Sequence, residues 1–127
     1  MPHCILVVDG DSRSLRLLEV GLAQAGYRVL TATSVADAIA VLETEAPDLV
    51  IADARGADGG GFALQQALAP RPLRLPFLFL LNEDDAAGRM RAAQLGTGEF
   101  LIKPVYLKEA LSRVALLLEK QAQRGER

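Results

Sequence analysis

The chain has 127 residues and a formal net charge of −2, and half of its residues are hydrophobic. This length suits one folded domain with its own apolar core. The 14 lysines and arginines are spread along the chain among 16 acidic residues, which argues against nucleic-acid binding by this domain. The single cysteine, Cys4, excludes an intrachain disulfide, and we expect a cytoplasmic protein. No apolar run is long enough to cross a bilayer, so we expect no membrane partner.

Five short apolar runs predict β-strands along the chain. Their buried rather than alternating character is typical of parallel strands that are covered on both faces of a sheet. The predicted strands are residues 4–8, 28–32, 48–52, 76–81 and 100–102.

Amphipathic segments between these strands predict helices. Leucines at helical spacing run from Leu15 to Leu22 and stop before Gly26, and Ser34 with Asp37 resembles a capping box at the start of a second helix. The alternation of strand and helix predicts an α/β fold with a doubly wound sheet of five parallel strands and helices on both faces. Further helices are expected over residues 61–69, 84–95 and 106–121, and the polar residues 122–127 are expected to fray or to begin a linker.

Carboxylates follow the first and third predicted strands. Asp9 and Asp11 come after the first strand with Gly10 between them, and Asp53 follows the third. These strands are neighbours in a doubly wound sheet, so we expect the three carboxylates to meet at one sheet edge. Such a cluster needs Mg²⁺ or another cation. Lys103 ends the fifth strand and supplies a cation at the same edge, where the following proline fixes the turn.

Three segments together resemble the bacterial response-regulator receiver domain. They are Asp9 after the first strand, "PDLVIAD" ending at Asp53, and "GEFLIKP", which contains Phe100 and Lys103. The resemblance covers residues 3–121 and implies a flavodoxin-like (βα)5 fold, with a receiver domain over residues 1–121 and a tail over 122–127.

The resemblance also implies roles for these residues in signalling rather than in enzymatic catalysis. Asp53 is then the phosphoacceptor for a histidine kinase, Lys103 contacts the phosphoryl oxygens, and Phe100 is the aromatic residue that changes rotamer. The acidic pocket formed by Asp9, Asp11 and Asp53, with the backbone carbonyl of Arg55, is where the family binds Mg²⁺.

Two positions depart from the family pattern. Gly10 stands where the second acid of the pair ligates Mg²⁺, and Leu81 stands at the switch position that carries Ser or Thr. Mg²⁺ demands nearly octahedral oxygen coordination, so we expect weak binding unless Asp11 substitutes, and Asp11 fits better as a helix cap. Leucine donates no hydrogen bond to a phosphoryl oxygen.

Without a metal the acids would repel one another, which directs attention to Arg55. This arginine lies two residues beyond Asp53, and Gly10 leaves space beside the acids. Because a guanidinium bridges two carboxylates well, one hypothesis is that Arg55 folds over the site and stands in for Mg²⁺. The alternative is that Arg55 points into solvent.

The sequence favours a degenerate receiver that acts as a protein-interaction module, with impaired or absent phosphorylation. A working phosphoacceptor modified on Asp53 is the alternative. A third reading is a haloacid-dehalogenase-like phosphatase using Asp9 and Asp11, but that family carries a lysine before its late acidic pair, and the first lysine here is Lys103. Expected partners are a histidine kinase or another signalling protein, or a second copy bound through residues 84–121.

Overall fold

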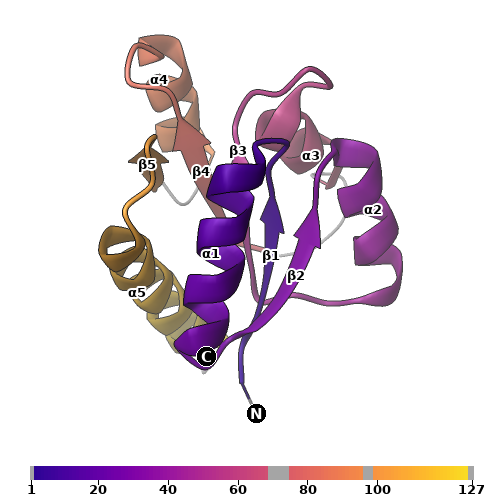
Figure 1. Cartoon of the computed structure of the whole chain (residues 1–127), viewed down its shortest axis with the longest axis vertical. Coiled ribbons are helices and arrows are strands. Elements are labelled where there is room, and N and C mark those ends of the chain that lie inside the picture. The colour runs from indigo at the N-terminus through magenta and orange to yellow at the C-terminus, as the bar shows by residue number, and fades with distance from the viewer. Residues whose placement is uncertain (1, 69–74, 96–98, 126–127) are drawn as a thin grey trace.

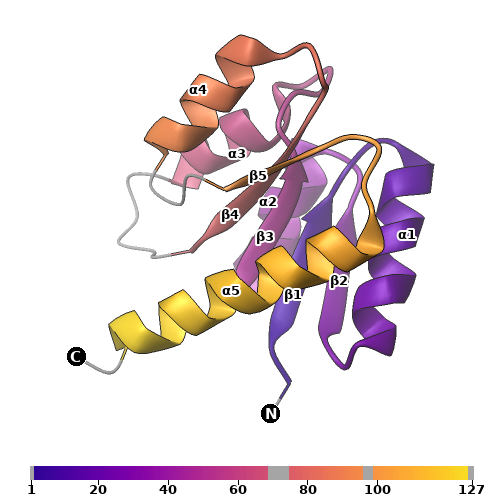
Figure 2. The same ribbon diagram turned by 90° about the vertical axis from the view of Figure 1, so that its left-hand side faces the viewer.

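Five parallel strands form one sheet in the order β2-β1-β3-β4-β5, with helices packed on both faces (Figures 1 and 2). This computed structural model describes residues 2–68, 75–95 and 99–125. The strands are β1 (Cys4–Val8), β2 (Arg28–Ala32), β3 (Leu49–Asp53), β4 (Phe77–Leu81) and β5 (Phe100–Ile102). The helices are α1 (Ser12–Gln24), α2 (Val35–Thr44), α3 (Gly60–Leu68), α4 (Ala86–Gln94) and α5 (Leu107–Gly125). The expected doubly wound α/β fold with a parallel sheet is therefore confirmed.

Two apolar clusters fill the space on either side of the sheet. Successive residues of β1 alternate between them, since Ile5 and Val7 face one cluster and Leu6 and Val8 face the other. Helices α1 and α5 close the first cluster, and α2, α3 and α4 close the second. Both faces of each central strand are thus buried, which explains why these strands read as continuous apolar runs. Only the ends of the strands are left for polar chemistry.

Helix boundaries differ from the expectation mainly at the end of the chain. Helix α5 continues to Gly125, past the expected end at residue 121, because neither glycine nor proline interrupts the sequence from residue 107 to residue 124. Ser34 caps α2 as expected, and its side chain accepts the backbone N–H of Asp37. The Asp37 carboxylate, however, accepts the hydroxyl of Thr33 rather than completing a capping box. Across the described residues, no helix has the length and apolarity required to span a membrane.

Helix α3 approaches β3 closely at Gly61. A Cβ at this position would lie 2.8 Å from the Cβ of Ala52 and 3.2 Å from the backbone oxygen of Asp53. Glycine at this point therefore sets the distance between α3 and the strand that carries Asp53.

We predict that Gly61→Ala lowers the free energy of unfolding by about 1 to 3 kcal/mol, although alanine is the better helix former. The added methyl group meets a rigid strand rather than a flexible side chain. Denaturant titration measures the change. Gly10→Ala is the control, since a Cβ there would meet only the Thr33 oxygen at 3.5 Å, and its effect should stay within about 0.5 kcal/mol. Equal effects of the two substitutions would contradict this account.

Candidate functional site

The ends of three strands bring Asp9, Asp53 and Lys103 to one edge of the sheet. In the β1–β3 register Val8 lies opposite Ala52, so the next residues lie side by side: Asp9 directly follows β1, and Asp53 is the last residue of β3. Strand β5 ends at the same edge on the far side of β4, and the backbone N–H of Lys103 donates to the carbonyl of Leu81 at 2.8 Å. The bond from Lys103 to Pro104 is cis.

The ammonium of Lys103 is shared between the two carboxylates. Its Nζ lies 3.0 Å from Oδ2 of Asp9 and 3.2 Å from Oδ2 of Asp53, and the lysine side chain is only 16% exposed. Burial on its own lowers the pKa of Lys103, but the hydrogen bonds and charges of Asp9 and Asp53 outweigh it and raise that pKa. Lys103 is therefore charged and partly neutralises the pair of acids.

Asp9 is the one polar or charged residue among the buried residues that the structure describes. Burial raises the pKa of its carboxyl group, against the lowering effects of the Asp11 backbone N–H, which donates to Oδ1 at 2.9 Å, and of Lys103. Oδ2 of Asp9 accepts no hydrogen bond of regular geometry from the described residues, although the Lys103 ammonium is near. This oxygen retains a lone pair that a cation can use.

Asp11 does not join the other two acids. Its carboxylate caps α1, where it accepts the backbone N–H of Arg13 at 3.0 Å and lies 3.4 Å from the hydroxyl of Ser14. The Arg13 N–H is the largest cause that lowers the pKa of Asp11. The prediction that the three carboxylates lie together is therefore wrong. Helix α1 begins at the residue after Asp11, and the Asp11 side chain caps it.

The donors at this edge fit Mg²⁺ only in part. Asp9 and Asp53 offer two carboxylates, and no group of three His, Cys, Asp or Glu side chains placed to hold a metal occurs within the described part of the chain. A Cβ at Gly10 would meet only the Thr33 oxygen, at 3.5 Å, so the position where the family has its second acid is open. An octahedral ion bound here by the two carboxylates and the Arg55 carbonyl would need other ligands, such as water, for its remaining positions.

Arg55 does not bridge the acids, contrary to one of the two hypotheses for it. Its Nε donates to Oδ2 of Asp85 at 2.6 Å, and its guanidinium carbon lies 5.5 Å from the centre of the Phe62 ring. The hypothesis that this guanidinium bridges the acids in place of Mg²⁺ is therefore wrong in this structure. Lys103 already contacts both Asp9 and Asp53, whereas the Asp85 carboxylate at the start of α4 is within reach of Arg55.

Leu81 and Phe100, the expected switch positions, belong to one apolar cluster. Leu81 is 1% exposed at the end of β4, and a Cβ at Gly88 of α4 would lie 2.8 Å from its Cδ2. The absence of a side chain at Gly88 therefore makes room for the Asp85 carboxylate, whose Cγ would lie 2.6 Å from the added Cβ, and for Leu81. Phe100 is partly buried in the same cluster and lies opposite Phe79 in the β4–β5 register.

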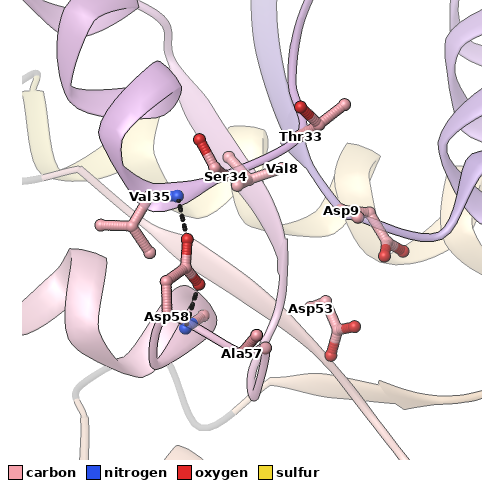
Figure 3. A pocket seen from close by; sticks show the side chains of 11 residues that line it. Val8, Asp9, Thr33, Ser34, Val35, Asp53, Ala57 and Asp58 are labelled. Atoms are coloured by element: carbon pink, nitrogen blue, oxygen red, sulfur yellow. Dashed lines mark hydrogen bonds between the residues drawn. The ribbon is translucent and has the colours of Figure 1, made fainter.

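An open cavity of about 380 Å³ adjoins the acids on the side of α2 and α3 (Figure 3). Asp9, Asp53 and Asp58 line it, together with the start of α2. Asp58 links the two helices, since its carboxylate accepts the N–H of Val35 at 2.7 Å and that of Gly60 at 3.1 Å. These two N–H groups lower the pKa of Asp58.

Sequence reasoning missed the roles of Asp58 and Asp85. Asp58 precedes three glycines, a pattern typical of an Asx turn, and Asp85 precedes two alanines at a helix start, where aspartate is a preferred cap. The expected helix over 84–95 hid the second signal, because it placed Asp85 inside the helix.

Comparison with known proteins assigns the chain to a family. The model of the response regulator receiver domain matches residues 5–115, so the chain belongs to the response-regulator receiver family, as the resemblance implied.

The curated relatives are longer than this chain. It is 31% identical over 116 residues to the alkaline phosphatase synthesis transcriptional regulatory protein PhoP of Bacillus subtilis, covering 91% of this chain and 48% of PhoP. It is also 31% identical over 117 residues to the transcriptional regulatory protein PrrA of Mycobacterium tuberculosis, covering 92% of this chain and 50% of PrrA. The chain thus spans about half the length of these relatives.

Solved structures show the same fold. The non-phosphorylated HemR receiver domain from Leptospira biflexa is 37% identical, with a TM-score of 0.81, and the match covers 91% of this chain and 94% of that one. A putative response regulator from Chloroflexus aurantiacus is 30% identical, with a TM-score of 0.85, and the match covers 94% of this chain and 99% of that one.

We predict that Lys103→Met destabilises the fold most at neutral pH. Without the ammonium, the pKa of the buried Asp9 rises further above its ordinary value. When a carboxyl group has a higher pKa in the folded protein than in the unfolded chain, the folded state is destabilised as the pH rises from the unfolded-state pKa to the folded-state pKa. The free energy of unfolding should fall by about 1 to 3 kcal/mol at neutral pH.

Denaturant titration across the acidic range measures this pH dependence. The loss in Lys103→Met should shrink below the ordinary pKa of aspartate, where Asp9, whose pKa is raised, is protonated. Lys108→Met is the matched control, because Lys108 is exposed on α5. A loss that stays constant with pH would show that Lys103 acts through packing alone.

Proposed function

We propose that this receiver domain is degenerate and acts as a protein-interaction module in two-component signalling, with impaired phosphorylation on Asp53. Two neighbouring residues support the proposal. The Asp11 carboxylate caps α1, and Gly10 has no side chain at the position of the family's second acid. Asp9 and Asp53 are then the only carboxylates that serve the metal, together with the backbone carbonyl of Arg55. Receiver domains are signalling modules, and we propose no enzymatic activity for this one.

A working phosphoacceptor remains the second candidate, and the Lys103 contacts favour it. In that reaction an Asp53 carboxylate oxygen forms a bond to phosphorus, and the bond between phosphorus and the kinase histidine nitrogen breaks, with its electron pair leaving on the imidazole. Lys103, 3.2 Å from Asp53, is placed to neutralise charge on the transferred group. Bound Mg²⁺ would supply further charge neutralisation, held by Asp9, Asp53 and the Arg55 carbonyl.

The proposed interaction surface lies on α4, β5 and α5, within residues 84–121. Met90 on α4 is 66% exposed and Tyr106, just before α5, is 69% exposed. Exposed aromatic and methionine side chains are enriched in protein interfaces. A second copy or another signalling protein, including a histidine kinase, is the expected partner, in the cytoplasm. We take residues 1–121 as the receiver unit and residues 122–127 as its tail.

We predict that the parent chain, incubated with a small phosphodonor and Mg²⁺, gains a phosphoryl group slowly or not at all by intact mass. Gly10→Asp supplies the missing carboxylate, and modification should become at least about 10- to 100-fold faster, in line with the effect of losing a metal-site residue. Asp53→Asn in the Gly10→Asp background is the control that must stay unmodified. Rapid modification of the parent chain would favour the working phosphoacceptor, and its loss in Asp11→Ala would show that Asp11 substitutes for the missing acid.

A second prediction concerns Phe100. Because Leu81 has no donor for a phosphoryl oxygen, a phosphoryl mimic at Asp53 should leave the Phe100 ring in one state. Beryllofluoride added to Gly10→Asp should shift the NMR signal of the Ala54 amide, next to Asp53, and leave the ring signals of Phe100 in place. A large change in those ring signals would refute a locked switch.

A further inference from the structure

The ion pair between Arg55 and Asp85 joins the loop after β3 to the start of α4. Two guanidinium nitrogens of Arg55 face the carboxylate, with Nε at 2.6 Å from Oδ2 and Nη2 at 3.4 Å from Oδ1. The Arg55 hydrogen bond is the largest cause that lowers the pKa of Asp85. The pair thus connects the loop that follows β3 with the segment that follows β4.

Each end of this ion pair has a second contact that matters for signalling. The backbone N–H of Arg55 donates to Oδ1 of Asp53 at 3.3 Å, so the arginine touches the candidate phosphoacceptor. Oδ1 of Asp85 caps α4 by accepting the N–H of Gly88 at 2.8 Å. The Arg55 side chain is 52% exposed, so it has room to turn between Asp85 and Asp53.

We propose that Arg55 is a positioning residue that binds a phosphoryl group on Asp53, and that its departure from Asp85 carries the signal to the start of α4. Leu81 provides no donor to this group, and a guanidinium supplies several in a geometry suited to phosphoryl oxygens. The inference rests on the proposed function in one respect, namely that Asp53 carries a phosphoryl group, however inefficiently.

Charge explains why Arg55 would change partners. A phosphoryl group carries about −1.5 to −2 charges near neutral pH, whereas the Asp85 carboxylate carries one. Lys103 already divides its charge between Asp9 and Asp53 and leaves the added charge partly unbalanced. Asp85 then keeps its place as the cap of α4 but no longer has a cation beside it. This changes the electrostatic field at the first turn of α4, which belongs to the proposed interaction surface.

The test uses beryllofluoride with Mg²⁺, followed by amide NMR, on the parent chain and on Gly10→Asp. The Ala54 amide reports loading at Asp53, and the Gly88 amide reports the cap of α4. With Arg55 present, both signals should shift together. In Arg55→Ala the Ala54 signal should still shift, and most of the Gly88 shift should be lost.

Two further variants separate a signalling role from a structural one. Arg91→Ala is the matched control, because Arg91 also lies over the Phe62 ring, at 4.6 Å, but is itself part of α4. It should leave the coupling of the two amides intact. Asp85→Asn retains a good cap and weakens the competition for Arg55, so the mimic should bind about twofold to fivefold more tightly. Loss of a merely structural ion pair would not tighten binding.

Three results would overturn the inference. The first is a Gly88 amide that shifts as much in Arg55→Ala as in the parent chain. The second is unchanged binding of the mimic in Asp85→Asn. The third is that neither the parent chain nor Gly10→Asp binds the mimic at Asp53. A parent chain that loads as tightly as Gly10→Asp would instead refute the impaired metal site of the proposed function, and the behaviour of Gly88 would still decide the role of Arg55.

Discussion

The interaction on which the rest of the site depends is the ammonium of Lys103 held between Asp9 and Asp53. The two apolar clusters bury both faces of the sheet, so charged groups are confined to the strand ends. Two carboxylates at one edge repel each other, and burial makes the charge on Asp9 costly. Lys103 offsets both effects, and in doing so it ties the end of β5, an edge strand, to the ends of β1 and β3.

The described ion pairs near this edge differ in their exposure to solvent. In the pairs of Lys103 the lysine side chain is 16% exposed, and in the Arg55–Asp85 pair the arginine side chain is 52% exposed. Salt screens exposed charges much more than buried ones. The contacts of Lys103 are therefore less open to screening, whereas the Arg55 side of its pair with Asp85 is the more open to it.

The sequence predicted the parts of this site that follow from the backbone. Buried apolar runs placed the strands, and the strand order of a doubly wound sheet brought Asp9 and Asp53 to one edge. The interpretation of Asp11 as a helix cap was confirmed as well. These features depend on local pattern and topology, which one sequence contains.

The position of Arg55 could not be predicted in the same way. The sequence left open whether Arg55 bridges the acids or points into solvent, and its pairing with Asp85 depends on where α4 begins in space. The end of α5 was also missed, because polar residues after Leu118 lack an apolar stripe yet contain nothing that stops a helix before Gly125. Long-range partners and helix ends are decided by competition between alternatives of similar free energy.

The close contact between Leu81 and Gly88 has a consequence for how this domain can change over evolutionary time. Threonine at position 81 would leave a void beneath α4. A side chain at position 88 would collide with the Asp85 carboxylate as well as with Leu81, since its Cβ would lie 2.6 Å from Cγ of Asp85 and 2.8 Å from Cδ2 of Leu81. A smaller residue at position 81 would therefore not open position 88, because the collision with Asp85 would remain. Position 10 meets no such constraint, since a Cβ there would meet only the Thr33 oxygen at 3.5 Å, so it is the freer of the two glycine positions to vary.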